Sequence, residues 1–261
     1  MTGEGAAGAL ERVAGAGRLL VASDFDGVLA PFVMDPMDAR AQEGTTETLR
    51  ALAALPRTWS AVVSGRDLAT LEALTGLAGS AVVRIGSHGA ETTRESGTGP
   101  TAEVADRLRR LREAVHAAVA ERDPAIRVEE KPTAVVLHTR GLAQESVAVA
   151  DEIAAEAATA EGVGLLTGKA VHELSVVRAD KGTALQGLAG ELGADAIVYL
   201  GDDVTDEHVF AVLGPHDLGI KVGDGETAAT VRLTDATEVP GLLTRLREQR
   251  AERVARSGSG R

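Results

Sequence analysis

Residues 19–27 read Leu-Leu-Val-Ala-Ser-Asp-Phe-Asp-Gly, and this stretch decides the fold. The short apolar run is typical of a buried strand in a parallel sheet, and polar residues follow where the run ends. Asp24 and Asp26 are one residue apart, so their side chains share one direction in extended backbone while Phe25 points the other way. Two such carboxylates can divide the work, one as a nucleophile and the other in proton transfer. Taken alone, the stretch fits a surface turn equally well, because Asp and Gly are common turn residues.

Three further apolar runs end in the same way. Residues 61–63 lead to Ser64-Gly65-Arg66, residues 81–85 to Gly86-Ser87-His88-Gly89, and residues 196–200 to Gly201-Asp202-Asp203. Helical patterns lie between them, one over about 45–55 and one that opens at Lys181. Short strands that alternate with helices predict a parallel α/β sheet with right-handed crossovers. Because open α/β sheets bind ligands at the carboxyl ends of their strands, we expect these four strand ends to form one site.

The middle of the chain has a different texture. Residues 100–176 contain a charged helix, strand-like runs at 127–131 and 134–140, and a helix near 145–160, without polar turns after the strands. We therefore expect this segment to be a small α/β domain inserted between core segments 1–99 and 177–261, and residues 257–261 to be a disordered tail.

Composition excludes several classes of function. Aromatic residues make up 2% of the chain and the formal net charge is −12, which disfavour base stacking and binding to a phosphate backbone. With no cysteine, a metal ion would need oxygen or imidazole ligands. No window approaches the roughly 20 apolar residues of a membrane span, and the N-terminus lacks the pattern of a secretory signal. We expect a monomeric cytoplasmic protein that binds neither nucleic acid nor membrane.

The acidic cluster at residues 201–207, Gly-Asp-Asp-Val-Thr-Asp-Glu, indicates a cation site. Carboxylates massed after a buried strand repel one another unless a cation neutralises them. Mg²⁺ prefers such hard oxygen ligands, together with waters and substrate phosphate. The same residues also suit a helix N-terminus, where Thr205, Asp206 and Glu207 favour capping and the helix dipole, and both interpretations can hold together.

Ser64 and Lys181 suit a bound phosphoryl group. Ser64 offers a hydroxyl beside the backbone N–H groups of a helix start, although a plain helix cap explains it as well. Lys181 stands at a helix start, where a cation gains nothing from the dipole, and a phosphoryl group would account for its placement. His88 follows a strand, and a structural role is as good an explanation for it as a contact with substrate.

Taken together, these motifs resemble those of the haloacid-dehalogenase-like phosphatase superfamily. The four motifs occur in the family's order: residues 24–29, Ser64, Lys181, and Gly201-Asp202-Asp203 with Asp206. Within the superfamily the chain looks most like trehalose-6-phosphate phosphatases, through residues 64–66, 87–91 and 201–207, and through Lys131, His138, Arg140, Lys169 and Glu173 in the middle segment. The chain departs from the family pattern at Val28, Ser87 and 174–176, and these departures remove neither a catalytic carboxylate nor Lys181.

The resemblance implies a Rossmann-like core with an inserted cap and a Mg²⁺-dependent phosphatase of trehalose biosynthesis. It implies that Asp24 is the nucleophile and that Asp26 is the general acid and base. Asp24, Asp26 and Asp202 would bind Mg²⁺ with support from Asp203 and Asp206, and Ser64 and Lys181 would hold the phosphoryl oxygens. The substrate would be bound by Ser64, Gly65, Arg66, His88, Lys131, His138, Arg140, Lys169 and Glu173.

Two other functions stay open at this point. The same chemistry serves another disaccharide or pseudodisaccharide phosphate. A sugar-phosphate sensor without catalysis belongs to a different class, and the presence of Asp24, Asp26, Lys181 and Asp202 argues against it.

Overall fold

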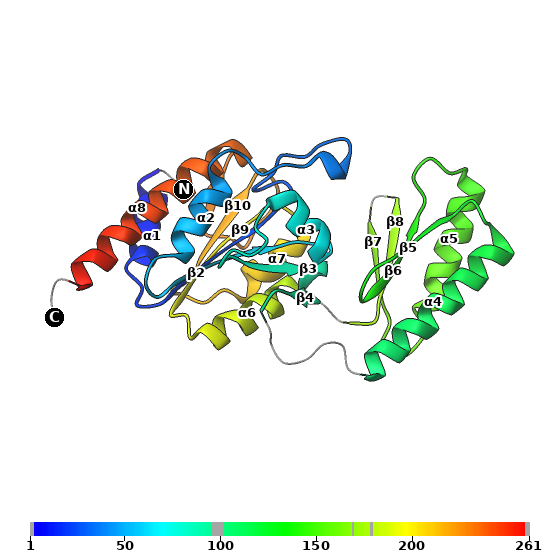
Figure 1. Ribbon diagram of the computed structural model, residues 1–261. Coiled ribbons are helices and arrows are strands. Elements are labelled where there is room, and N and C mark those ends of the chain that lie inside the picture. The colour runs from blue at the N-terminus through cyan, green and yellow to red at the C-terminus, as the bar shows by residue number, and fades with distance from the viewer. Residues whose placement is uncertain (1–2, 95–101, 169, 178–179, 259–261) are drawn as a thin grey trace. The chain divides into compact units, whose positions relative to one another are not determined.

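The computed structural model describes residues 3–94, 102–168, 170–177 and 180–258 (Figure 1). The chain divides into two compact units, Met1–Arg94 with Asp180–Arg261 as unit 1, and Glu95–Ala179 as unit 2. Unit 1 contains α1 Gly3–Ala14, β1 Leu19–Asp24, η1 Pro36–Asp38, α2 Thr45–Ala53, β2 Thr58–Val63, α3 Leu68–Thr75, β3 Val83–Gly86, η2 Ser87–Gly89, β4 Glu91–Thr92, α6 Lys181–Leu192, β9 Ala196–Gly201, α7 Val204–Val212, β10 Leu218–Val222, β11 Val231–Leu233, η3 Ala236–Glu238 and α8 Val239–Gly258. Unit 2 contains α4 Ala102–Arg122, β5 Arg127–Glu130, β6 Ala134–His138, α5 Gln144–Ala157, β7 Gly164–Gly168 and β8 Val171–Ser175.

Unit 1 is built around a mainly parallel sheet. Among the described residues its seven strands run in the order β11-β10-β9-β1-β2-β3-β4, and only β4 is antiparallel to its neighbour. Strand β1 lies in the middle, between β9 and β2, and all six of its residues are buried. A parallel sheet covered on both faces needs such continuous apolar strands.

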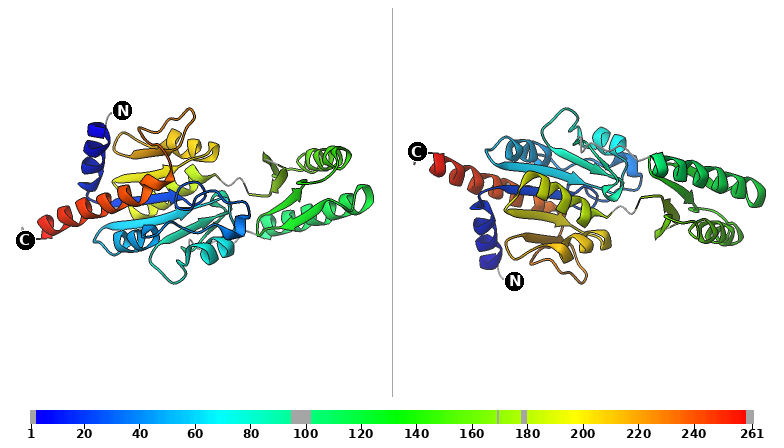
Figure 2. Two further views of the ribbon diagram at one scale, coloured as in Figure 1. Left: turned by 90° about the horizontal axis from the view of Figure 1, so that it is seen from above. Right: turned by 90° about the horizontal axis from the view of Figure 1, so that it is seen from below.

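Helices cover both faces of this sheet (Figure 2). Leu19 and Val21 of β1 belong to a core cluster with α1, α2, α3 and α8, whereas Leu20 and Ala22 belong to a second cluster with α6 and α7. Alternate residues of a strand point to opposite faces, so one apolar run serves both clusters. In Figure 2, α8 (red) lies over the sheet in the view from above and α6 (yellow-green) in the view from below.

Unit 2 is a smaller α/β unit in which two helices pack against one face of a sheet. Its described residues form an antiparallel sheet of order β5-β6-β8-β7. Val135, Leu137 and Leu174 face α4 and α5, where they join the apolar cluster of this unit. Glu173 pairs with Val136 in register, so these two residues share the opposite face of the sheet.

The predicted fold class, a Rossmann-like core with a parallel sheet and a smaller α/β unit within the chain, is confirmed. The assignment of the domains to 1–99, 100–176 and 177–261 stays a prediction. The predicted disordered tail, residues 257–261, also stays a prediction; α8 is described as far as Gly258. An i,i+4 ion pair between Glu252 and Arg256 supports this last stretch of helix. Residues 259–261 lie outside the described part of the chain. None of the described helices has an apolar stretch of the length that a membrane span needs.

Candidate active site

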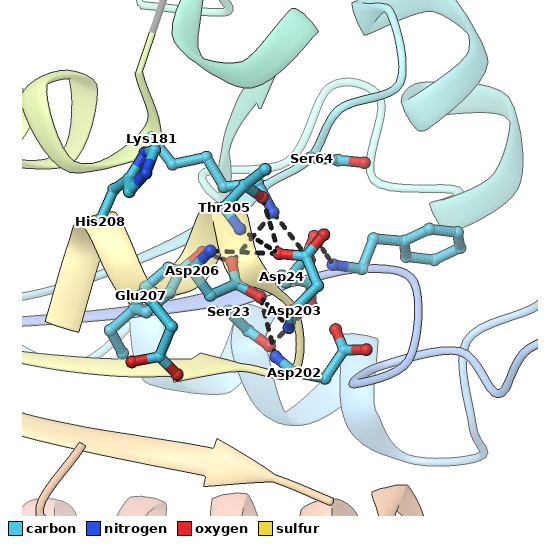
Figure 3. Close-up of polar contacts among 12 residues, drawn as sticks. Ser23, Asp24, Ser64, Lys181, Asp202, Asp203, Thr205, Asp206, Glu207 and His208 are labelled. Atoms are coloured by element: carbon cyan, nitrogen blue, oxygen red, sulfur yellow. Dashed lines mark hydrogen bonds and ion pairs between the residues drawn. The ribbon is translucent and has the colours of Figure 1, made fainter. Parts of the chain in front are cut away.

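Asp24 lies at the carboxyl end of the central strand. It pairs in register with Val63 of β2, one residue before Ser64, so two of the predicted motifs end side by side. Its side chain is almost completely buried; Oδ1 accepts a hydrogen bond from the backbone N–H of Phe25 at 2.6 Å, and Oδ2 accepts one from Lys181 at 2.8 Å (Figure 3). Burial raises the pKa of Asp24 well above its ordinary value; the charge of Lys181 opposes this rise and that of Asp206 adds to it.

Lys181 is a buried cation between two carboxylates. It is the first residue of α6, after Asp180, which caps the helix by accepting from the backbone N–H of Thr183. Its Nζ lies 2.8 Å from Asp24 Oδ2 and 2.9 Å from Asp206 Oδ1, and the side chain is 2% exposed. Burial works to lower the pKa of Lys181, but the charges of Asp24 and Asp206 outweigh it and raise the pKa above its ordinary value. The ammonium group therefore stays charged at neutral pH.

Asp206 holds the acidic loop together. Oδ1 accepts from Lys181 Nζ at 2.9 Å and from the Tyr199 hydroxyl at 2.7 Å; Oδ2 accepts from the backbone N–H groups of Asp202 at 2.8 Å and Asp203 at 3.1 Å. A carboxylate has about four acceptor positions, so these donors fill them. Asp203 and Asp206 also form a reciprocal capping box at the start of α7. Both sequence interpretations of this cluster, a helix cap and a cation site, are therefore compatible in one structure.

Asp202 packs against the turn that follows β1. Gly27 has a φ of +75°, and a Cβ there would overlap the Asp202 carboxylate, so a side chain at this position would be strained. Oδ1 of Asp202 is buried without a hydrogen-bond partner among the described residues. Burial, with the charges of Asp206 and Asp203, raises the pKa of Asp202 to about 7. Lys221 Nζ donates a hydrogen bond to the backbone carbonyl of Asp202.

The residues present fit a divalent cation. Within the described parts of the chain, one carboxylate oxygen each from Asp24, Asp203 and Asp206 lie within 4.8 Å of one another. Because the acceptor positions of Asp206 are already filled, Asp206 is better suited to orient the loop than to bind an ion. The buried, unpaired oxygen of Asp202 supplies a free hard donor of the kind that Mg²⁺ prefers. The ligand set Asp24, Asp26 and Asp202 stays a prediction.

Asp26 and Arg66 form a two-point ion pair. Arg66 Nε lies 2.7 Å from Asp26 Oδ2, and Nη2 lies 2.6 Å from Oδ1. The guanidinium group also lies over the Phe25 ring, 5.7 Å from its centroid. The buried Ser64 hydroxyl accepts from the backbone N–H of Arg66 at 3.1 Å. The loop after β2 therefore reaches the proposed acid, and Arg66 contacts that acid directly.

The predicted sugar-binding residues of the middle segment lie in unit 2. Lys131 Nζ and Glu173 Oε2 form an ion pair at 2.6 Å, with both side chains 15% exposed. His138 ends β6 and lies 2.7 Å from Glu129 Oε2, on the same sheet face as Glu173. Arg140 is exposed in the turn after β6, and Lys169 lies outside the described residues. The structure therefore brings three of these five residues to one sheet face and leaves Arg140 at its edge.

Two contributors to the site were missed by the sequence analysis. Tyr199 is completely buried in β9, and Lys221 is 4% exposed in β10. Each is a polar residue inside an apolar strand, and a buried hydroxyl or ammonium must find a partner. That mismatch is the signal that could have revealed them.

Residues 22–237 match the model of the trehalose-phosphatase family. A trehalose-phosphate phosphatase from Mycobacterium tuberculosis is 37% identical over 251 residues, which are 90% of this chain and 62% of that protein. The chain thus spans about three fifths of the length of this curated relative. A crystal structure of a trehalose-6-phosphate phosphatase related protein has a TM-score of 0.71 at 26% identity and covers 89% of this chain and 99% of that one. The trehalose-6-phosphate phosphatase of Aspergillus fumigatus has a TM-score of 0.68 at 26% identity and covers 92% and 96%.

Proposed function

Because this chain belongs to the trehalose-phosphatase family, we propose that it hydrolyses trehalose 6-phosphate to trehalose and inorganic phosphate. The observation that carries the proposal is the buried Asp24–Lys181–Asp206 arrangement at the end of β1. A carboxylate that is desolvated, yet fixed by one cation, is placed to attack an electrophile and has little water to displace. The relatives, which are trehalose-phosphate phosphatases, supply the sugar of this proposal.

The first step uses Asp24 and Asp26. An oxygen of Asp24 attacks phosphorus, the bond from phosphorus to the sugar oxygen breaks, and Asp26 gives its proton to that oxygen. Lys181 and Ser64 hold the phosphoryl oxygens and offset the charge that develops on them. Arg66 contacts both oxygens of Asp26, so this ion pair has to open at one oxygen before Asp26 can carry the proton. The product of this step is an aspartyl phosphate on Asp24 and a free sugar.

The second step returns the site to its first state. Asp26, now a carboxylate, takes a proton from a water molecule that attacks phosphorus, and the bond from Asp24 to phosphorus breaks. Inorganic phosphate leaves and Asp24 is a carboxylate again. One residue, Asp26 in the turn after β1, thus serves first as an acid and then as a base.

We propose Mg²⁺ as the cation, held by Asp24, Asp202 and the backbone carbonyl of Asp26, with Asp203 and Asp206 in support. The unpaired Oδ1 of Asp202 is the observation that favours Asp202 as a ligand. When bound, Mg²⁺ neutralises carboxylate and phosphate charge as a Lewis acid.

We further propose that unit 2 is a cap domain that binds the sugar through Lys131, His138, Arg140, Lys169 and Glu173, and that Gly65 and Arg66 assist in unit 1, where His88 either contacts the substrate or supports the loop that does. Sugar hydroxyls donate and accept, so an acceptor such as Glu173 beside cationic donors suits them. The Lys131–Glu173 pair at 2.6 Å supplies both kinds of group on one surface.

The test is phosphate release from a panel of sugar phosphates in Mg²⁺ buffer. Trehalose 6-phosphate should be hydrolysed with a higher kcat/KM than sucrose 6-phosphate, mannosyl phosphoglycerate or p-nitrophenyl phosphate. Preference for another disaccharide phosphate would replace the substrate and keep the mechanism. Binding without phosphate release from any of them would identify a sugar-phosphate sensor instead.

A further inference from the structure

The turn that follows β3 has unusual backbone. Ser87, His88 and Gly89 have φ values of 48°, 55° and 116°, so three successive residues adopt left-handed conformations and two of them carry side chains. Positive φ values are uncommon for residues other than glycine, and they persist only where the surrounding structure holds the backbone in place. Ser87 is buried, and its hydroxyl donates to Glu91 of β4. The turn is therefore fixed in place on its own sheet.

One side of this turn is bonded to the loop that carries Ser64. The backbone N–H of His88 donates to the carbonyl of Ser64 at 2.9 Å, and that of Ser87 donates to the carbonyl of Arg66 at 2.7 Å. The His88 ring covers the residue between them, because a Cβ on Gly65 would lie 2.5 Å from His88 Cε1 and 2.6 Å from Nε2. Every residue of the 64–66 loop thus contacts the turn.

The other side of the turn packs against the start of α6. A Cβ on Gly89 would lie 3.0 Å from the carbonyl oxygen of Asp180 and 2.8 Å from Ala184 Cβ. Asp180 caps α6 and immediately precedes Lys181. The left-handed conformation at Gly89 and this close approach both require glycine.

We propose that the turn Ser87–Gly89 is a positioning element that sets the separation between the 64–66 loop and the first turn of α6, with the His88 ring as the surface on which Gly65 rests. Ser64 and Lys181 are the two groups assigned to the phosphoryl oxygens, so the inference rests on the function proposed above. It gives His88 a role through Ser64 and Arg66 rather than through the sugar. A misplacement of about 1 Å at such groups is enough to cost roughly 100-fold in rate.

The experiment is a double-mutant cycle of Gly65→Ala and His88→Ala in the full chain with Mg²⁺. It measures kcat/KM on trehalose 6-phosphate and, by calorimetry, the Kd of orthovanadate, a tetrahedral oxyanion without a sugar. Gly65→Ala should lower kcat/KM and weaken orthovanadate binding by about 10- to 100-fold in the wild-type background. In the His88→Ala background, where the ring no longer meets the new methyl group, the same change should cost less than about threefold.

A second pair of variants covers the case in which Gly65→Ala does not fold, as judged by its thermal melting midpoint. Gly89→Ala places a methyl group at positive φ against Asp180 and Ala184. Gly79→Ala is the matched control, because Gly79 has a φ of +69° and a Cβ there would meet nothing within 4 Å. Orthovanadate binding should weaken in Gly89→Ala and stay at the wild-type value in Gly79→Ala.

Equal costs of Gly65→Ala in both backgrounds, or equal orthovanadate binding by the Gly89 and Gly79 variants, would overturn the inference. A His88→Ala variant that binds orthovanadate normally but has a raised KM for trehalose 6-phosphate would also overturn it, in favour of a direct sugar contact. If the wild-type chain is active, these results for the variants would leave the proposed function standing. A wild-type chain that neither hydrolyses the ester nor binds orthovanadate would overturn both.

Discussion

Replacement of Lys181 by methionine should separate the structural role of this side chain from its proposed catalytic role. Methionine keeps most of the volume and removes the charge, so Asp24 and Asp206 lose the cation that lies 2.8 Å and 2.9 Å from them. Removing one partner of a buried ion pair costs about 3–5 kcal/mol, because the remaining charge is left uncompensated. Lys221→Met is the matched control: Lys221 is also buried, but it donates to a backbone carbonyl and lies 3.7 Å from Glu207, so we expect a cost of about 1–2 kcal/mol.

The cost of Lys181→Met should also depend on pH. The pKa of Lys181 is raised, so its stabilising charge is present below its ordinary value of 10.5 and does not change between pH 5 and pH 8. The pKa of Asp24 is raised above its ordinary value of 3.8, so the folded state binds the carboxyl proton more tightly than the unfolded state does. The free energy of unfolding therefore falls as the pH rises from 3.8 to the raised pKa of the folded state. Without Lys181 the pKa of Asp24 rises further, and the window extends upward.

Urea denaturation of the wild type and both variants at pH 5 and pH 8, without Mg²⁺, measures these differences. We expect a larger loss of unfolding free energy for Lys181→Met at pH 8 than at pH 5, and loss of at least about 100-fold in kcat at either pH. A cost of about 1 kcal/mol or less at both pH values would refute the idea that Lys181 compensates Asp24 and Asp206.

Three further outcomes test other parts of the site. Asp24→Asn should lower kcat by roughly 10⁴-fold or more while the fold survives, since Lys181 keeps Asp206 as a partner; substantial phosphate release would exclude the covalent route. EDTA should abolish activity and Mg²⁺ restore it, and Asp202→Ala should weaken Mg²⁺ activation more than it raises KM; an equal loss in both would indicate a structural role. Glu173→Ala should lower kcat/KM on trehalose 6-phosphate by roughly 30- to 150-fold and spare p-nitrophenyl phosphate, whereas equal losses on both esters would indicate damage to the core.

The parallel sheet could be predicted because its strands carry strong local signals. The apolar runs at residues 19–23, 61–63 and 196–200 are short and closed by polar turns, and burial on both faces demands that pattern. Strands β10 and β11 gave no such signal. Lys221 interrupts the apolar run of β10, and β11 is only three residues long, so their membership in the sheet depends on long-range pairing.

The site was predictable to the extent that it follows from topology. Once β1 is known to lie between β2 and β9, residues after these strands must converge at one edge of the sheet. The individual side-chain contacts could not be predicted from the sequence. Arg66 pairs with Asp26 across 40 residues, and Lys181 contacts Asp24 across 157. Such contacts depend on rotamers and loop geometry that residue spacing does not specify.

The acidic edge of the sheet is a place where function works against stability. Burial raises the pKa values of Asp24 and Asp202, so ionising these two groups costs more free energy in the folded chain than in the unfolded chain. Lys181 offsets part of that cost for Asp24, and the bonds to Asp206 fix the loop, yet Oδ1 of Asp202 still has no partner among the described residues. A chain selected only for stability would bury apolar side chains here instead. The persistence of this incomplete charge balance is physical grounds for expecting a cation and a phosphate at the same edge, because together they supply the charges and donors that the protein's own residues leave out.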